Sequence, residues 1–185
     1  NPLGMETHDF LWSLAASLHT NPRAEQDDFS LWRRISDRIR ENQYQSIRTV
    51  IMLDDAGYSN AGSYGGAIRT PTFDRIGDEG IRYTHMTVAA VCSPTRGSLL
   101  TGHNIHTIGT GIISEFASGY PGYNSQMDYS TPSIAKILTE NGYATAAFGK
   151  WHNTPMEEAS PVGPFHAWPT GLWGFEYFYG FLGGE

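Results

Sequence analysis

A twelve-residue stretch, residues 92–103, constrains this chain most, and it reads CSPTRGSLLTGH. It contains Cys92, the single cysteine of 185 residues, directly after the β-prone run VAAV. The pattern predicts a strand that delivers Cys92, a tight turn at residues 93–95, and a helix-like segment at residues 98–100 that Gly102 ends. Arg96 and the start of a helix would both favour negative charge near the thiol. The alternative interpretation of a lone cysteine is a small hydrophobic core residue.

The overall composition argues against several classes of function. With 12 basic and 19 acidic residues, the formal net charge is −7, which disfavours a nucleic-acid-binding surface. A lone cysteine excludes an internal disulfide framework and a cysteine-based zinc site. No apolar run is long enough to predict a transmembrane segment. The apolar stretch at residues 10–18 has no lysine or arginine before it, which argues against a signal peptide. The compartment stays open, with the cytoplasm favoured over the periplasm.

Residues 1–45 are predicted to form a helical leader whose role the sequence does not indicate. Apolar side chains recur at helical spacing over residues 8–19 and 29–42, and Asn21 and Pro22 separate the two segments. The arginines of the second segment are interpreted as a solvated face. Residues 46–185 are assigned to a separate domain.

From residue 49 onward, predicted strands alternate with predicted helices, which indicates an α/β fold with a mostly parallel sheet flanked by helices. The predicted strands lie within residues 49–53, 81–91 and 143–148, and the predicted helices lie between Thr70 and Gly80 and between Ser130 and Gly142. Phe73 and Ile76 are expected to face the sheet. The tryptophans and other aromatic residues of the last segment, residues 153–185, are expected in the core or in a subunit contact.

Groups with useful chemistry follow all three predicted strands. They are Asp54 and Asp55, then Cys92, then Lys150 and His152. Because the carboxyl ends of parallel strands meet at one edge of a sheet, where ligands bind in α/β folds, these groups are expected to converge. An exposed surface charge is the alternative interpretation of Lys150.

The adjacent carboxylates of Asp54 and Asp55 point to a metal ion. Two carboxylates at the end of a buried strand repel each other and are costly to desolvate. Calcium or magnesium would offset this cost, because both prefer oxygen ligands. A polar loop is the alternative interpretation of this pair.

Residues 92–102 resemble the signature of the type I sulfatases, in which C-x-P-[ST]-R is followed by a leucine pair and Thr-Gly. The segment AGYSNAGSYGG at residues 56–66 resembles the glycine-rich segment that follows the metal-binding aspartates of that family. GYATAAFGKWH at residues 142–152 resembles the second sulfatase signature, and residues 163–185 resemble bacterial arylsulfatases. The chain is similar to the N-terminal part of a formylglycine-dependent, bacterial arylsulfatase-like sulfatase.

The resemblance implies an alkaline-phosphatase-like sulfatase fold, incomplete in this chain, and hydrolysis of sulfate monoesters. In the family the cysteine is oxidised after translation to formylglycine, whose hydrated aldehyde is the nucleophile. The resemblance therefore implies that a formylglycine-generating or other maturation enzyme modifies Cys92. It also implies that Asp54, Asp55 and the modified Cys92 bind calcium, or magnesium in its place.

Catalytic roles for three further residues follow from the same resemblance. Arg96 would stabilise the oxygens of the modified Cys92, and Lys150 would neutralise charge on the transferring group. His152 would orient or deprotonate a hydroxyl of the hydrate and assist release of sulfate.

The chain departs from the family pattern at two points. His103 replaces the arginine that ends the usual signature, and no Asp-Asn dipeptide is present to complete the metal site. Family members are longer and carry the remaining metal and substrate residues later in the sequence. The 185 residues alone are therefore expected to be inactive.

Three other functions are weighed against the sulfatase interpretation. A formylglycine-dependent phosphonate or phosphodiester hydrolase of the same superfamily and a non-catalytic domain that binds sulfated ligands both remain open. A cysteine-dependent phosphatase is disfavoured, because only three residues separate Cys92 from Arg96 and Pro94 removes an amide donor that a phosphate loop needs. The sequence does not identify the natural sulfate ester or the oligomeric state.

Overall fold

The computed structural model describes residues 30, 33–35, 37, 47–159 and 167–184. The chain divides into two compact units, Asn1–Met86 (unit 1) and Thr87–Glu185 (unit 2). The predicted helix at residues 8–19 lies outside the described residues. In the predicted helix at residues 29–42, the five described residues are all helical.

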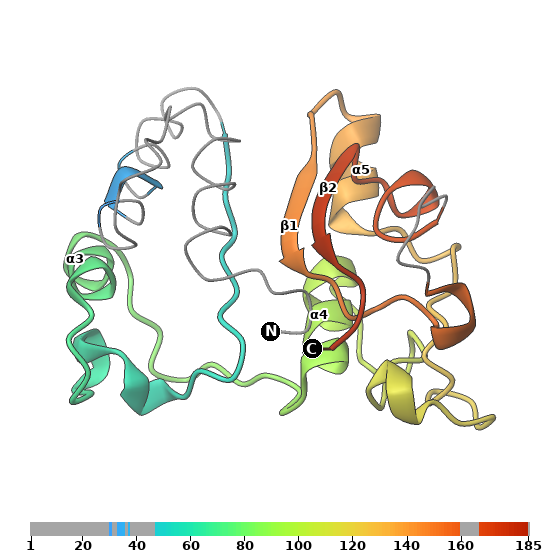
Figure 1. Ribbon diagram of the computed structural model, residues 1–185, viewed down its shortest axis with the longest axis horizontal. Coiled ribbons are helices and arrows are strands. Elements are labelled where there is room, and N and C mark those ends of the chain that lie inside the picture. The colour runs from blue at the N-terminus through green and yellow to red at the C-terminus, as the bar shows by residue number, and fades with distance from the viewer. Residues whose placement is uncertain (1–29, 31–32, 36, 38–46, 160–166, 185) are drawn as a thin grey trace. The chain divides into compact units, whose positions relative to one another are not determined.

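Unit 1 contains two 3-10 turns, η1 (Tyr58–Asn60) and η2 (Gly62–Tyr64), and the helix α3 (Pro71–Glu79) (Figure 1). The predicted helix between Thr70 and Gly80 is confirmed, with proline at its first position and the Gly80 amide bonded to the Ile76 carbonyl at 2.9 Å. Ile76 is 55% exposed, so the expectation that it faces a sheet is wrong. The helix packs against η2 instead.

Two of the three predicted strands, at residues 49–53 and 81–91, are loops in the structure. Their apolar side chains are largely exposed, as at Val50 (75%) and Ile81 (80%). An apolar, β-branched run forms a strand only when a neighbouring strand supplies hydrogen-bond partners and burial. Among the residues that the structure describes, neither segment has such a neighbour, so both strand predictions are wrong.

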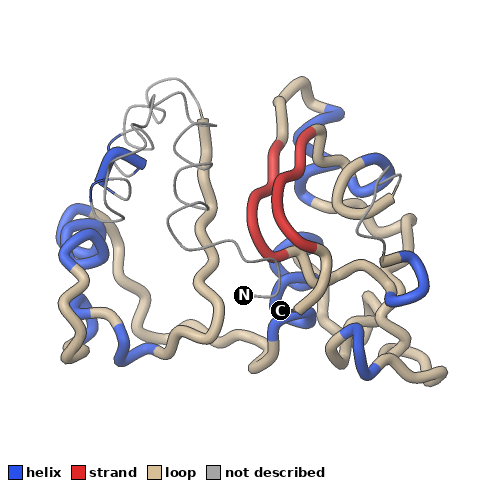
Figure 2. The backbone as a smooth tube through the Cα atoms, viewed as in Figure 1, coloured by secondary structure: helices blue, strands red, loops and turns tan. Residues whose placement is uncertain are grey.

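Unit 2 contains a parallel pair of strands, β1 (Ala146–Lys150) and β2 (Tyr177–Phe181) (Figure 2). The register pairs Ala146 with Tyr177 and Lys150 with Phe181. The third predicted strand is thus confirmed, although it ends at Lys150 rather than at residue 148. A parallel pair flanked by helices agrees with the predicted α/β class. The second strand was not predicted, because its aromatic sequence was assigned only to the core.

The core of unit 2 is built on tryptophan side chains. Its buried members are Ile108, Met127, Trp151, Trp168 and Trp173. The rings of Trp168 and Trp173 stack with their centroids 5.1 Å apart, which contributes about 0.5–1.5 kcal/mol beyond the area buried. The prediction that these two tryptophans belong to the core is confirmed. Tyr177 and Tyr179, which were expected in the same core or in a subunit contact, are exposed in this chain.

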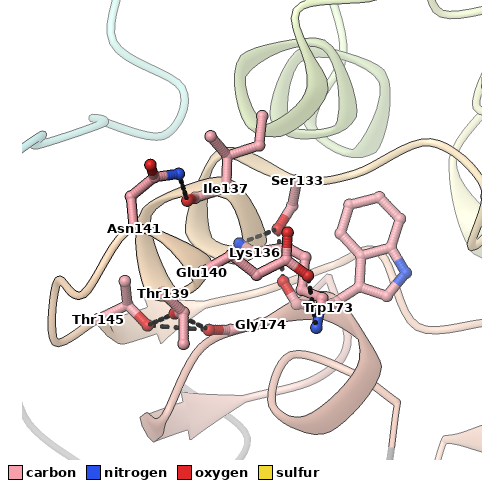
Figure 3. A network of polar contacts seen from close by, with 9 residues as sticks. All are labelled: Ser133, Lys136, Ile137, Thr139, Glu140, Asn141, Thr145, Trp173 and Gly174. Carbon is pink, nitrogen blue, oxygen red and sulfur yellow. Dashed lines mark hydrogen bonds and ion pairs between the residues drawn. The ribbon is translucent and has the colours of Figure 1, made fainter.

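The helix α5 (Ile134–Glu140) begins after a buried serine cap (Figure 3). The Ser133 hydroxyl accepts a hydrogen bond from the Lys136 amide at 3.1 Å and donates one to the Trp173 carbonyl. The predicted start at Ser130 is therefore three residues too early. The correct cap was not evident from local pattern, because its second partner lies 40 residues away in the sequence.

A threonine pair continues this network toward β1 (Figure 3). The hydroxyls of Thr139 and Thr145 donate to the Gly174 carbonyl at 2.8 and 2.9 Å. Gly174 has φ +91°, and a Cβ there would lie 2.4 Å from the backbone nitrogen of Lys136. Only glycine permits both this conformation and this close approach. The network joins α5 to the segment that leads into β2.

The α-helices that the structure describes in full are short. α3, α5 and α4 (Cys92–Thr101) contain 9, 7 and 10 residues. Among the described residues, none of the helices has the length and apolar character needed to cross a membrane.

Candidate active site

Cys92 is the first residue of α4, which begins six positions before the predicted start at residue 98. The predicted turn at residues 93–95 is thus wrong: these residues form the first helical turn. Pro94 is tolerated there because an amide in the first turn has no partner within the helix. The predicted end is confirmed, since Gly102 has φ +70° and its amide bonds to the Ser98 carbonyl at 2.8 Å.

The loop that precedes Cys92 is held in place by the side chain of Thr95, a residue of α4. The Thr95 hydroxyl donates to the Val91 carbonyl at 2.8 Å and accepts from the Ala89 amide at 3.2 Å. Between these contacts, Ala90 adopts φ +64°. The loop before the helix is thereby fixed, and the half-buried Cys92 follows directly from it.

Arg96 joins α4 to the carboxyl end of β1, and Figure 1 shows the helix beyond that end of the strand. Its Nη1 donates a hydrogen bond to the main-chain carbonyl of Lys150 at 2.6 Å. The neighbouring Gly97 packs so closely that a Cβ there would lie 2.9 Å from the Ile108 Cδ1 atom. Two neighbouring residues of α4 therefore provide a hydrogen bond from a charged side chain and a close apolar contact.

His152 is buried two residues after Lys150 and has a strained backbone with φ +58°. Its amide bonds to the Leu182 carbonyl at 3.0 Å, which continues the β1–β2 pairing beyond the strands. Its Nε2 lies 2.7 Å from the Glu115 Oε2 atom. Its Nδ1 is buried without a partner among the described residues. Glu115 thus holds the imidazole at Nε2, whereas Nδ1 is available to a further partner.

Glu115 belongs to the 3-10 turn η3 (Ser114–Phe116). Burial alone would raise the pKa of this carboxyl. The hydrogen bonds from His152, from the main chain and from the Ser114 hydroxyl outweigh burial, so the pKa of Glu115 is lowered. The carboxyl is therefore ionised at neutral pH and acts only as an acceptor.

Two of the predicted site residues, Asp55 and His152, have left-handed backbone conformations. Among the described non-glycine residues, positive φ occurs at Asp55, Ala90, Ser125 and His152. Asp55 and His152 are predicted site residues, and Ala90 lies two positions before Cys92. Such conformations cost about 1–3 kcal/mol each and cluster at functional sites. The choice of site residues made from the sequence stays a prediction.

Four of the six predicted site residues lie in unit 2, on α4 and at the end of β1: Cys92, Arg96, Lys150 and His152. Asp54 and Asp55 belong to unit 1 and are exposed. Within the part of the chain that the structure describes, no three His, Cys, Asp or Glu side chains are close enough to hold a metal ion. The convergence of Asp54 and Asp55 with Cys92 therefore stays a prediction.

The chemistry of Asp54 and Asp55 fits part of a site for a hard cation. Carboxylate oxygens are the ligands that calcium and magnesium prefer, and Asp55 turns the chain at φ +52° directly after its neighbour. Calcium takes about six to eight oxygens, more than two carboxylates supply. The pair accounts for part of a coordination shell and needs additional ligands.

Glu115, the partner of His152, is a candidate site residue that sequence reasoning missed. It lies in the glycine-spaced loop at residues 109–122, 37 positions before its partner His152. Neither residue type nor local spacing distinguishes it from an exposed acid, so no signal in a single sequence identifies it.

Comparison with known proteins places the site in context. The sulfatase family profile matches residues 49–185. The chain is 38% identical over 110 residues to an uncharacterized sulfatase of Schizosaccharomyces pombe, which covers 56% of this chain. It is 34% identical to arylsulfatase D of Homo sapiens over 146 residues, and this match covers 75% of the present chain. It is 30% identical to an arylsulfatase of Klebsiella aerogenes over 137 residues, and this match covers 73% of the present chain.

This chain is also similar to a solved structure. The crystal structure of Ps i-CgsB superposes with a TM-score of 0.56 and 33% sequence identity over 71% of this chain. The chain spans only a part of each relative: 20%, 23% and 28% of the three sequences named above, and 27% of the structure.

Proposed function

Because the chain belongs to the sulfatase family, we propose that the full-length protein hydrolyses sulfate monoesters through a formylglycine made from Cys92. The proposal is supported above all by the hydrogen bond from the Arg96 guanidinium to the main-chain carbonyl of Lys150. This hydrogen bond joins the helix that begins at Cys92 to the strand end that leads into His152. A nucleophile precursor, two cations and an imidazole thus belong to one compact unit.

Cys92 is the precursor of the nucleophile rather than the nucleophile. A maturation enzyme removes two electrons and two protons from the Cβ–Sγ group and passes them to an oxidant such as dioxygen. Water then replaces the sulfur, which leaves as hydrogen sulfide, and an aldehyde remains. Addition of a second water gives the hydrate with two hydroxyls. A helix N-terminus favours negative charge on these oxygens.

The hydrolytic cycle needs one attack and one elimination. A hydrate oxygen attacks sulfur, the bond from sulfur to the ester oxygen breaks, and the alcohol leaves with a proton. The second hydroxyl then loses its proton to His152, the aldehyde re-forms, and sulfate leaves as the bond from carbon to the sulfated oxygen breaks. Water rehydrates the aldehyde, so the residue is regenerated.

The cationic side chains stabilise charge during this cycle. Arg96 holds the oxygens of the modified residue while its Nη1 remains bonded to the Lys150 carbonyl. The Lys150 ammonium neutralises charge on the transferring sulfuryl group. The 185 residues have a formal net charge of −7, so binding of a doubly charged anion among them needs such local positive charge.

Asp54 and Asp55 are proposed ligands of a divalent metal, calcium or magnesium, together with the oxygens of modified Cys92. When bound, such an ion would polarise a sulfate oxygen as a Lewis acid. The remaining ligands come from outside the 185 residues, since the chain lacks an Asp-Asn pair. For this reason the 185 residues alone are proposed to be inactive.

Turnover of an aryl sulfate and an aryl phosphonate by the matured full-length protein tests the proposal. We expect hydrolysis of the sulfate to dominate and Cys92→Ala to abolish it. Preference for the phosphonate would assign the protein to the phosphonate hydrolases of the same superfamily. Binding of sulfated ligands without turnover, unchanged in Cys92→Ala, would show a non-catalytic domain.

A further inference from the structure

We propose that Glu115 is a positioning residue that holds His152 in the tautomer with the proton on Nε2, so that Nδ1 is the nitrogen that exchanges protons with the site. This inference rests on the proposed function, because it assigns a partner to the imidazole of that mechanism. It adds a residue outside the segments that carry the sulfatase resemblance.

The contact between the two side chains is short and sheltered. His152 Nε2 lies 2.7 Å from Glu115 Oε2, and the His152 side chain is 3% exposed whereas that of Glu115 is 34% exposed. A buried imidazole therefore meets a carboxylate that keeps some contact with water. The lowered pKa of Glu115 agrees with an ionised acceptor at neutral pH.

The ionised carboxylate determines which ring nitrogen carries the proton. A carboxylate only accepts hydrogen bonds, so Nε2 must donate. In the neutral imidazole the lone pair then lies on Nδ1, which is buried and has no partner among the described residues. The ring nitrogen that can act as a base is thus selected by the carboxylate of Glu115.

The surrounding backbone restricts reorientation of the ring. The His152 amide is bonded to the Leu182 carbonyl, and its φ of +58° is a conformation that few residues adopt. A Cβ at Gly184 would lie 2.6 Å from His152 Cε1 and 3.3 Å from Glu115 Oε1. The main chain of Gly184 therefore packs over both partners and keeps the pair together.

Enzyme kinetics of the matured full-length protein test the proposal. Glu115→Gln keeps the shape of the side chain, but its amide both donates and accepts, so it no longer selects one tautomer. We expect kcat for an aryl sulfate to fall about tenfold to a hundredfold, the range typical of losing an orienting partner, with KM changed less than about twofold. Glu115→Asp, which keeps an acceptor-only carboxylate, should recover part of the loss.

A matched control and a maturation check accompany these variants. Glu140→Gln removes an exposed carboxylate that pairs with Lys136 at 3.2 Å on α5, and it should leave kcat unchanged. The aldehyde content at Cys92 must be equal in all variants. A kcat of Glu115→Gln within about twofold of the unsubstituted protein would overturn the proposal.

The tautomer can be read directly, without any substitution at Glu115. In protein with ¹⁵N-labelled histidine, the His152 signal, assigned by its loss in His152→Asn, should show a protonated Nε2 and an unprotonated Nδ1. A proton on Nδ1 would overturn the inference even if Glu115→Gln does not fold. Failure of the unsubstituted protein to hydrolyse any sulfate ester would instead refute the proposed function and leave the tautomer measurement to decide this inference.

Discussion

The guanidinium of Arg96 donates to the main-chain carbonyl of Lys150 at 2.6 Å, across 54 residues of sequence. This contact joins the two segments that carry the sulfatase signatures. It fixes the start of α4 against the end of β1 and gives Arg96 a structural role in addition to its proposed contact with the modified residue. The same side chain therefore affects both stability and activity.

Replacing Arg96 should destabilise the fold. Arg96→Lys keeps a positive charge but loses the planar fork that reaches the Lys150 carbonyl. We expect the free energy of unfolding of the full-length protein, measured by chemical denaturation, to fall by about 1.5–3 kcal/mol.

Arg82 provides the matched control for this substitution. Its Nη1 donates to the Ser63 carbonyl at 2.8 Å, but the contact is exposed. Arg82→Lys should cost less than about 0.5 kcal/mol. Equal losses for the two variants would show that the Arg96 contact has no special structural role.

Ser133→Ala removes the cap of α5. The substitution leaves the Lys136 amide and the buried Trp173 carbonyl without this partner. We expect thermal and chemical denaturation to report a loss of about 1–3 kcal/mol. The exposed Ser130, at the start predicted from the sequence, is the control, and Ser130→Ala should be nearly neutral. A larger effect at Ser130 would contradict the assigned helix start.

Glycine is required at position 174 for two separable reasons. Gly174→Ala imposes a side chain at φ +91° and places a Cβ 2.4 Å from the Lys136 backbone. Gly142 has a similar φ of +84° with nothing within 4 Å, so Gly142→Ala measures the conformational cost alone, about 1–2 kcal/mol. Gly174→Ala should cost at least about 2 kcal/mol more. Equal losses by denaturation would show that the close approach is unimportant.

The pair of Glu115 and His152 makes stability depend on pH. Because the pKa of Glu115 is lowered in the folded protein, its contribution is fully present above its unfolded pKa and is lost as pH falls through the folded value. The stability difference between unsubstituted protein and Glu115→Gln should therefore shrink on acidification below about pH 4.5.

Melting temperatures measured from neutral pH to about pH 3 would record this change. Gly142→Ala changes no ionisable group and places its Cβ where nothing lies within 4 Å, so its difference from the unsubstituted protein should stay constant. If the difference in melting temperature between Glu115→Gln and the unsubstituted protein also stays constant with pH, the lowered pKa of Glu115 is contradicted.

The parts of the site that could be predicted are those encoded by contiguous residues. Cys92 and Arg96 share one helical turn, and Lys150 and His152 lie at or just beyond a strand end. Each pair belongs to one contiguous segment that resembles a sulfatase signature, so the resemblance was enough to choose them, and their roles stay predictions. The helix end at Gly102 was likewise predictable, because a left-handed glycine has a local signature.

What escaped prediction depends on contacts distant in sequence. The runs at residues 49–53 and 81–91 have the composition of strands, but composition does not supply the neighbouring strand that a ladder requires. The α5 start depends on Trp173, and the role of Glu115 depends on His152. In these cases a residue acquires its structure from a partner about 40 positions away.

The state of Cys92 in the full-length protein tests the central proposal most directly. Trypsin releases it in the peptide of residues 83–96, whose mass distinguishes an aldehyde from a thiol. We predict the aldehyde, in part hydrated, when the protein is produced in a host that carries the maturation enzyme. An unmodified thiol from such a host, in protein that still hydrolyses sulfate esters, would contradict the account.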